Sequence, residues 1–155
     1  MKIRRAEMID LDEVVDILNR VAQNLQEKGI HQWDYPWERD KIEKEIKSDQ
    51  AFILFNDKKA IGTFFIREID GLSELAVPPQ SNYLNKIAIL PEYQGKNIGA
   101  IIIDYACSFS HKLNKTLYLD CWAGNDKLKA FYAGHGFNYL GDFPEDDYYI
   151  SVYQK

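Results

Sequence analysis

The chain has 155 residues, which is the usual length of one domain with a sizeable core. Its hydrophobic fraction of 46% and its charged fraction of 28% are ordinary for a soluble globular protein. The formal net charge of −5 at pH 7 argues against nucleic acid as the main partner. No apolar run approaches the roughly 18 residues of a membrane span, so a membrane is not an expected partner either.

The N-terminal stretch MKIRRAEMIDLDE becomes acidic before any apolar segment begins. We therefore expect no secretory signal and a cytoplasmic location. The two cysteines, Cys107 and Cys121, lie in apolar segments and lack the spacing of metal ligands. Buried, reduced thiols are expected, with no metal site.

An amphipathic helix is predicted from Asp10 to about Gly29. Asp10 and Glu13 have the spacing of a capping box, and Gly29 suits the helix end. A second helix is predicted after Pro36, where charged residues surround two isoleucines. The apolar stripe of the first helix has the i, i+3, i+4, i+7 spacing and consists of Leu11, Val14, Val15, Leu18, Val21, Ala22 and Leu25.

The next segment is rich in residues that favour β-strands. Strands are predicted at Ala51–Phe55 and Ala60–Ile69, joined by a hairpin turn at residues 56–59. The segment Gly71–Gln80 contains two adjacent prolines and is predicted to be a loop. A third strand is predicted at Tyr83–Leu90.

A helix is predicted from Gly95 or Lys96 to about Leu113, followed by a strand at Thr116–Trp122. With the preceding strand these form a β–α–β unit, so the two strands should be parallel. No repeat or linker interrupts the chain, and a single α/β domain over residues 1–155 is expected. The remaining predicted elements are a short helix at residues 126–133 and strands at 137–143 and 148–153.

The stretch PEYQGKNIGA (Pro91–Ala100) lies where a predicted strand passes into a predicted helix. Ligands of parallel sheets bind at the carboxyl ends of the strands, and a helix N-terminus offers unpaired N–H groups to an anion. Two glycines and Asn97, which tolerates left-handed geometry, suit a backbone cradle for a pyrophosphate. A plain structural turn explains the same residues equally well. Neither the Walker nor the dinucleotide-binding glycine pattern is present.

Two motifs in this region resemble those of the GCN5-related N-acetyltransferase (GNAT) superfamily. The stretch IAILPEYQGKNIGA is similar to motif A, whose core is Gln or Arg, two residues, Gly, one residue, and Gly or Ala. The stretch LDCWAGNDKLKAFYAGHGF (Leu119–Phe137) is similar to motif B. The order of the predicted elements also matches along nearly the whole chain. One departure is Asn97, which stands where the motif has its first glycine and whose side chain would crowd a pyrophosphate.

The resemblance implies the GNAT fold: a central mixed, mostly antiparallel sheet with two parallel central strands splayed for CoA, and helices on both faces. It implies acetyl-CoA or another acyl-CoA as acyl donor and an amine as acceptor. The pantetheine arm would pair with the backbone of residues 87–89, and the N–H of Ile89 would stabilise the oxyanion. The residues implied to bind the cofactor are Ile87, Ala88, Ile89, Gln94, Gly95, Lys96, Asn97, Ile98, Gly99, Ala100 and Asn125.

The acid that protonates the leaving thiolate in this family corresponds to Tyr132, seven residues after Asn125. An aromatic residue packed under the sheet is the alternative. For the base, many members place a glutamate on the strand that matches Tyr83–Leu90, where this chain has Asn85 and Lys86.

Other members of the family carry the base on the following strand, five residues before the asparagine, and that position is Asp120. A carboxylate in mid-sheet is costly unless it is paired or solvated. Asp120 is therefore expected to be either a base that acts through water or a structural carboxylate. Asn125 is expected to cap the short helix and also to contact the pantetheine arm.

Four residues with aromatic rings, His31, Trp33, Tyr35 and Trp37, lie where the acceptor loop of the family is found. Trp33, Tyr35 and Trp37 are predicted to bind the acceptor, with packing against the body of the protein as the alternative. His31 as a base is a lesser hypothesis. A non-catalytic acyl-CoA sensor is the competing function, and the protein is expected to be a monomer or a homodimer.

Overall fold

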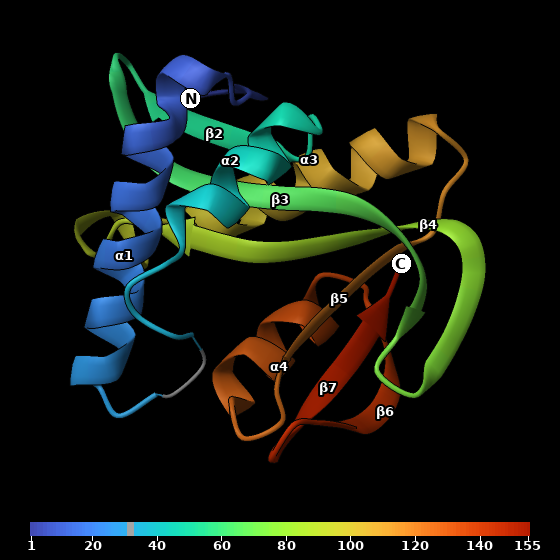
Figure 1. The fold of residues 1–155 in the computed structure, drawn as a ribbon. Helices are drawn as coiled ribbons and strands as arrows, with labels where there is room; N and C mark the ends of the chain where they lie inside the picture. The colour runs from blue at the N-terminus through green and yellow to red at the C-terminus, as the bar shows by residue number, and fades with distance from the viewer. Residues whose placement is uncertain (31–32) are drawn as a thin grey trace. The chain divides into compact units, whose positions relative to one another are not determined.

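The computed structural model describes residues 1–30 and 33–155 (Figure 1). Short 3₁₀ turns at Met8–Asp10 and Pro91–Tyr93 precede α1 and α3. The elements in chain order are β1 (Lys2–Arg5), α1 (Leu11–Glu27), α2 (Arg39–Lys47), β2 (Ala51–Asn56), β3 (Lys59–Leu72), β4 (Leu75–Ile89), α3 (Ile98–Lys112), β5 (Leu117–Trp122), α4 (Asp126–Gly134), β6 (Asn138–Glu145) and β7 (Tyr148–Gln154).

The strands form a seven-stranded sheet in the order β1-β2-β3-β4-β5-β7-β6. β1 with β2, β2 with β3, β5 with β7 and β6 with β7 are antiparallel. β4 and β5 are parallel, with Asn82 opposite Leu117 and Tyr83 opposite Tyr118. The predicted mixed α/β sheet with one parallel pair joined through a helix is confirmed.

The chain forms two compact units. The first unit contains residues 1–66 and 86–99, and the second contains residues 67–85 and 100–155. β3 and β4 therefore contribute residues to both units. The expectation of a single domain over residues 1–155 stays a prediction.

The core of the first unit lies between α1, α2 and the strands β2 and β3. The apolar stripe of α1 is buried along Val14, Leu18 and Val21, which confirms the predicted face of this helix. Ile42 and Ile46 of α2 join the same core. Figure 1 shows α1 and α2 close to each other in this part of the molecule.

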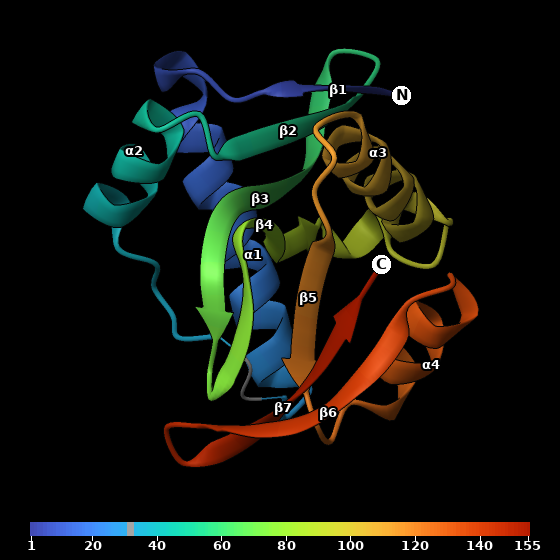
Figure 2. The ribbon, with the colours of Figure 1, turned by 90° about the vertical axis from the view of Figure 1, so that its right-hand side faces the viewer.

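The second unit is built around β5, β7 and β6, which lie in that order in the sheet (Figure 2). Its core includes Tyr118 of β5 and Ile150 and Val152 of β7. Ile69 and Leu72 of β3 pack into the same cluster. The strands predicted at residues 116–122, 137–143 and 148–153 are confirmed, and buried residues follow one another in β5 and β7 rather than alternating with exposed ones.

The predicted loop at Gly71–Gln80 is wrong. β3 continues to Leu72 and β4 begins at Leu75, so only a tight turn separates them, with Ser73 at a φ of +57°. Pairing of β4 with β5 begins at Asn82, beyond both prolines, so the missing N–H groups of proline break no ladder with β5. The two prolines therefore led to a predicted loop where the chain forms a strand.

The predicted capping box of α1 is also wrong. Asp10 is the N-cap residue, but its carboxylate makes no capping bond to α1. The carboxylate instead accepts hydrogen bonds from both terminal nitrogens of Arg4, at 2.7 and 2.9 Å, and from the N–H of Glu7 at 2.7 Å. These bonds connect α1 to β1, a strand that the sequence pattern did not indicate because only four residues form it.

Within residues 1–30 and 33–155, no helix is both long enough and apolar enough to cross a membrane. Both cysteines are free and buried, as predicted. Burial raises the pKa of the Cys107 and Cys121 thiols, so both remain protonated at neutral pH.

Candidate active site

The loop before α3 has an irregular backbone. Gly95 has a φ of +77° and Asn97 a φ of +64°, so both residues adopt left-handed conformations. These conformations delay the start of α3 to Ile98, two to three residues later than predicted. Asn97 adopts the backbone geometry expected of a glycine substitute, because asparagine tolerates this region better than most residues.

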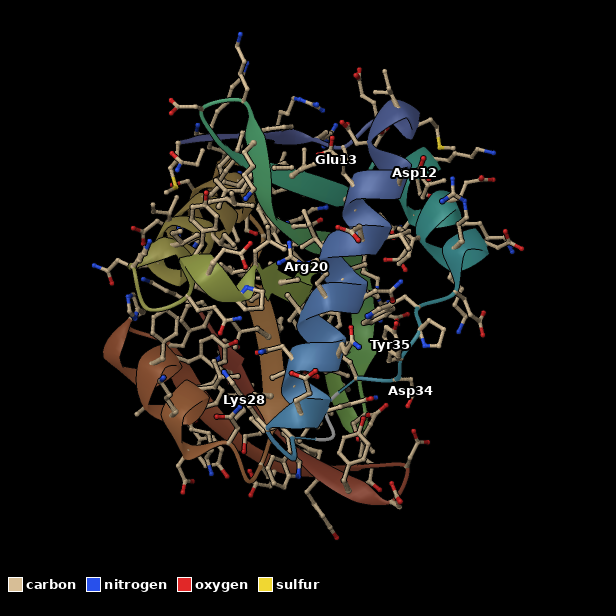
Figure 3. The ribbon with its side chains drawn as sticks, turned by 90° about the vertical axis from the view of Figure 1, so that its left-hand side faces the viewer. Asp12, Glu13, Arg20, Lys28, Asp34 and Tyr35 are labelled. Atoms are coloured by element: carbon tan, nitrogen blue, oxygen red, sulfur yellow. The ribbon has the colours of Figure 1, made fainter. Side chains whose placement is uncertain are left out.

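Side chains of the first unit fix this loop from several directions. The Gln94 amide donates a 2.9 Å hydrogen bond to the carbonyl of Ile89 and so connects the two ends of the turn. Glu92 accepts two 3.1 Å bonds from Arg20 of α1, which Figure 3 labels. The ammonium groups of Lys59 and Lys96 each lie 5.4 Å from the centre of the Tyr93 ring. The loop conformation is therefore well determined by its neighbours.

The end of β4 carries the predicted pantetheine-binding residues, Ile87 to Ile89. Just before them Lys86 has a φ of +51°, which is unusual for a strand residue other than glycine. Its ammonium contacts Glu45 at 3.0 Å and lies 5.0 Å from the centre of the Phe65 ring. Lys86 is thus part of an ion pair.

Gly62 of β3 allows a close backbone approach to β4. A Cβ at this position would lie 3.1 Å from the carbonyl oxygen of Ala88. The N–H of Leu90 donates to the carbonyl of Ile61 at 2.9 Å, so the end of β4 is joined to β3. The segment that carries the predicted oxyanion donor, Ile89, is held on this side by a neighbouring strand.

Asp120 of β5 accepts hydrogen bonds in the second unit. The hydroxyl of Tyr83 on β4 lies 3.0 Å from both carboxylate oxygens and donates to them. The guanidinium of Arg67 on β3 lies 5.2 Å from the centre of the Tyr83 ring. Neither Tyr83 nor Arg67 was predicted, because their relation to Asp120 arises from strand pairing between distant parts of the sequence.

The surroundings of Asp120 raise its pKa to about 6. Burial is the largest cause, and the negative charge of Glu145 acts in the same direction. The hydrogen bond from Tyr83 and the charge of Arg67 lower the pKa and partly offset the burial. A carboxyl with this pKa is mostly ionised at pH 7 and is a stronger base than an ordinary aspartate.

Tyr132 of α4 is buried, with an exposed fraction of 4%. Its ring packs against Phe137 and against Tyr153 of β7, with centroid distances of 6.1 and 5.7 Å. Burial, followed by nearby Cys121 and Asp120, raises the pKa of its hydroxyl well above the ordinary value. Tyr132 therefore keeps its proton at neutral pH, which a general acid requires.

Asn125 is the N-cap of α4, as predicted. Its side-chain oxygen accepts the N–H of Leu128 at 3.1 Å, and its carbonyl accepts the N–H of Lys129 at 3.1 Å. Its own N–H donates to the carbonyl of Trp122 at 2.9 Å, so Asn125 is hydrogen-bonded both to the end of β5 and to the first turn of α4. The structural half of the prediction for Asn125 is confirmed.

The aromatic residues of the predicted acceptor loop differ in their packing. Trp33 and Trp37 contact each other edge to face at 5.4 Å, and both pack against the core of the first unit. The backbone N–H of Trp37 donates to the side-chain oxygen of Asn19 on α1 at 2.7 Å. Tyr35, labelled in Figure 3, is 45% exposed. Both tryptophans make the packing contacts of the alternative, and their role in acceptor binding stays a prediction. His31 lies outside the described residues.

The first unit has an open groove of about 720 Å³ between α1 and the β2–β3 turn. Charged residues of both signs line it, among them Lys59. Glu13 and Arg20 of α1, which Figure 3 labels, also line it. Leu90 and Tyr93 are also part of its lining. None of the predicted site residues lines this groove.

The predicted residues are divided between the units. The second unit holds Asp120, Asn125 and Tyr132, together with Ala100. The first unit holds Ile87, Ala88, Ile89, Gln94, Gly95, Lys96, Asn97, Ile98, Gly99, Trp33, Tyr35 and Trp37.

The fold and the two motifs define an acetyltransferase-type protein, and comparison with known proteins agrees. Residues 12–137 match the model of the Acetyltransferase (GNAT) family, which is most of the chain. The chain belongs to this family. The resemblance that the motifs indicated is confirmed.

Relatives and solved structures carry the same designation. An uncharacterized N-acetyltransferase of Archaeoglobus fulgidus is 26% identical over 86% of this chain and 90% of its own length. YesJ of Bacillus subtilis, also an uncharacterized N-acetyltransferase, is 23% identical over 85% of this chain and 78% of its own. A crystal structure of a GNAT-family acetyltransferase from Listeria monocytogenes has a TM-score of 0.81 at 22% identity, covering 99% of this chain and 93% of its own. The GNAT fold is thereby confirmed.

Proposed function

We propose that this protein is an N-acetyltransferase that moves an acetyl group from acetyl-CoA to a primary amine of a small molecule or a peptide. Family membership and the left-handed backbone of the loop before α3 support this reading most directly. The family generally uses acetyl-CoA, which supplies the acetyl group as an activated thioester. The reaction is a direct attack by the amine in a ternary complex, without an acyl-enzyme.

The loop of the first unit fits an anionic cofactor. A Cβ built at Gly95 would meet nothing within 4 Å, so this side of the loop is open. The left-handed residues Gly95 and Asn97 stand just before the N-terminus of α3, where unpaired N–H groups and the helix dipole favour negative charge. We assign the residues Gln94 to Ala100 to the pyrophosphate and Ile87 to Ile89 to the pantetheine arm.

The second unit supplies the proposed acid and base. Asp120 takes a proton from the ammonium form of the acceptor through a water molecule. The free amine attacks the thioester carbon to form the carbon–nitrogen bond, and Tyr132 gives its proton to the sulfur as the carbon–sulfur bond breaks. The second proton that the nitrogen loses goes to solvent, from which Tyr132 regains one. The N–H of Ile89, in the first unit, is proposed to stabilise the oxyanion. Asn125 is proposed to contact the pantetheine arm in addition to its capping role.

A non-catalytic acyl-CoA sensor is the second candidate. Two observations favour it: Asn97 replaces the first glycine of motif A, and Lys86, near the position of the family's strand glutamate, is engaged with Glu45. Such a sensor would bind acetyl-CoA without releasing free thiol in the presence of any amine.

A screen of amine acceptors with acetyl-CoA tests the proposal, with free thiol as the measured product. Release of thiol that depends on both an amine and the protein is the expected result. Tight binding of acetyl-CoA with no thiol release across small amines, polyamines and peptides would support the sensor. The cytoplasmic location, the acceptor-binding role of Trp33, Tyr35 and Trp37, and the monomeric or homodimeric state stay predictions.

A further inference from the structure

Tyr83 comes close to Asp120 through the register of the parallel strands. Tyr83 on β4 lies opposite Tyr118 on β5, and Asp120 is two residues beyond Tyr118. Side chains two residues apart on a strand point to the same face, so Asp120 lies diagonally across from Tyr83. Both carboxylate oxygens are 3.0 Å from the Tyr83 hydroxyl. One phenolic proton is thus shared between two acceptors, which centres the hydroxyl on the carboxylate.

We infer that Tyr83 is a positioning residue for Asp120 and that Arg67 holds the Tyr83 ring in place, an inference that rests on the proposed role of Asp120 as base. Tyr83 is partly buried between these two residues, and its ring receives the Arg67 guanidinium at 5.2 Å. Cation–π contacts of this kind restrict an aromatic ring. The order Arg67, Tyr83, Asp120 therefore runs across β3, β4 and β5 within the second unit.

Tyr83 can act only as a donor in this arrangement. Burial and the charge of Asp120 raise the pKa of its hydroxyl well above the ordinary value, so it stays protonated at neutral pH. A phenol that always donates favours the ionised form of its partner. It also restricts rotation of the carboxylate and so fixes where the remaining lone pairs point.

Two opposing sets of groups act on Asp120. Burial and Glu145 raise its pKa, whereas Tyr83 and Arg67 lower it. Without the Tyr83 donor the pKa would rise further, and less of the base would be ionised at pH 7. The titratable and charged groups that face Asp120 are Arg67 of β3, Tyr83 of β4, Cys121 of β5, Tyr132 of α4, Glu145 of β6 and Tyr148 of β7.

Tyr83→Phe removes the donor and keeps the ring for Arg67. The acidic limb of kcat/KM against pH should move to higher pH by about one pH unit, because a hydrogen bond to a charged group has about that effect on a pKa. The shift alone should lower the rate about fivefold at pH 6 and about twofold at pH 7, and above pH 9 the rate should return to within about threefold of wild type. The wild-type limb should lie near pH 6.

Tyr118→Phe is the matched control, since Tyr118 faces Tyr83 in the register and loses the same hydroxyl. Burial alone raises the pKa of Tyr118, and Asp120 is not among its causes. The acidic limb of kcat/KM for Tyr118→Phe should stay at the wild-type pH. Arg67→Gln is a second variant at an exposed residue, and it should move the limb in the same direction by less.

A titration of the Asp120 carboxyl carbon by NMR measures the contact without any turnover. The midpoint should be higher in Tyr83→Phe than in wild type and in Tyr118→Phe. An unchanged midpoint, with a rate lowered by one factor at all pH values, would overturn the inference and make Tyr83 a packing residue. A midpoint that moves while Asp120→Asn turns over like wild type would overturn the catalytic role, and would place the failure in the proposed base.

Discussion

The loop before α3 and the Asp120 cluster differ in what carries the proposed chemistry. In the loop, the backbone is proposed to bind the ligand: Gly95 and Asn97 adopt left-handed conformations just before α3 begins. In the cluster, side chains from β3 and β4 act on one carboxylate of β5, with Tyr83 and Arg67 opposing the effect of burial. The loop is a single continuous segment of the first unit, whereas the cluster collects residues more than 50 positions apart within the second.

This difference predicts how each region should respond to substitution. A backbone cradle should be sensitive to the conformational range of its residues and tolerant of side-chain loss. A tuned carboxylate should be sensitive to the loss of single atoms and to pH. A loop that is sensitive to loss of its side chains, or an Asp120 that is insensitive to loss of its hydrogen-bond donor, would contradict this difference between the two regions.

The largest effect is expected for Asp120→Asn. The amide keeps the size of the side chain and can still accept from Tyr83, but it cannot take a proton. The value of kcat/KM at pH 7 should fall by about 10²-fold or more. Part of the loss should disappear at higher pH, where more of the acceptor amine is deprotonated without help. Steady-state rates across pH 6 to 10 measure this.

Stability gives an independent control for that variant. The raised pKa of Asp120 means that its charge opposes folding, since stability falls as pH rises from the ordinary carboxyl pKa to about 6. The free energy of unfolding of Asp120→Asn at pH 7 should therefore be no lower than that of wild type. Asp142→Asn, at a carboxylate bonded to Tyr139 and Ser151, should leave the rate unchanged. Equal rates for Asp120→Asn and wild type would assign the base elsewhere.

The next effect is expected for Tyr132→Phe, which should lower kcat on the order of 10²-fold. Thiolates leave fairly well without protonation, so the lower end of the range for general acids applies. Phenylalanine keeps the ring that packs against Phe137 and Tyr153, so stability should change little. The measurement is kcat at saturating acetyl-CoA and acceptor.

Tyr153→Phe is the matched control for Tyr132, because the two rings pack at 5.7 Å and both hydroxyls have a pKa that burial raises. Its kcat should equal that of wild type. A kcat of Tyr132→Phe within twofold of the wild-type kcat would mean that Tyr132 serves only in packing, like its neighbours Phe137 and Tyr153.

The sequence predicted the loop better than the cluster. Small and polar residues between a strand and a helix indicate a local backbone geometry, and Asn97 adopts the conformation expected from its residue type. Asn125 was predicted as a helix cap for the same local reason, and its side chain accepts the N–H of Leu128. Local signals of this kind need no knowledge of the tertiary structure.

The residues that contact Asp120 could be predicted only from the register of the paired strands. Nothing in the residues around Tyr83 indicates Asp120, and the pairing of Tyr83 with Tyr118 fixes the contact only once β4 and β5 are parallel. The prolines of residues 71–80 had the opposite effect, because their local signal indicated a loop where tertiary pairing extends β4. Element type was predictable wherever local and tertiary preferences agreed.

A smaller effect, about tenfold in the dissociation constant of CoA, is expected for Gly95→Val. A β-branched residue at a φ of +77° is strained by about 1–3 kcal/mol, and relief of that strain would rotate the N–H groups of the loop. Lys96→Ala keeps the backbone and should be milder. Calorimetric titration with CoA measures both.

Gly29→Val is the matched control for the loop. Gly29 has nearly the same φ, +75°, and also has nothing within 4 Å of an added Cβ, but it follows the end of α1. It should lower the free energy of unfolding and leave the affinity for CoA unchanged. Equal affinities in Gly95→Val, Lys96→Ala and wild type would show that the cofactor does not use this loop.

The smallest effects are expected at Asn125, whose side chain caps α4 and is also proposed to contact the pantetheine arm. Asn125→Ala removes the oxygen that accepts from Leu128, so the free energy of unfolding should fall by about 1 kcal/mol. Asn125→Ser keeps a capping oxygen of nearly equal strength and loses only the amide. If the amide also contacts the pantetheine arm, the serine variant should keep wild-type stability and bind CoA about threefold more weakly. Urea unfolding and calorimetric titration of both variants separate the two roles, since a serine variant with unchanged affinity would leave Asn125 as a helix cap alone.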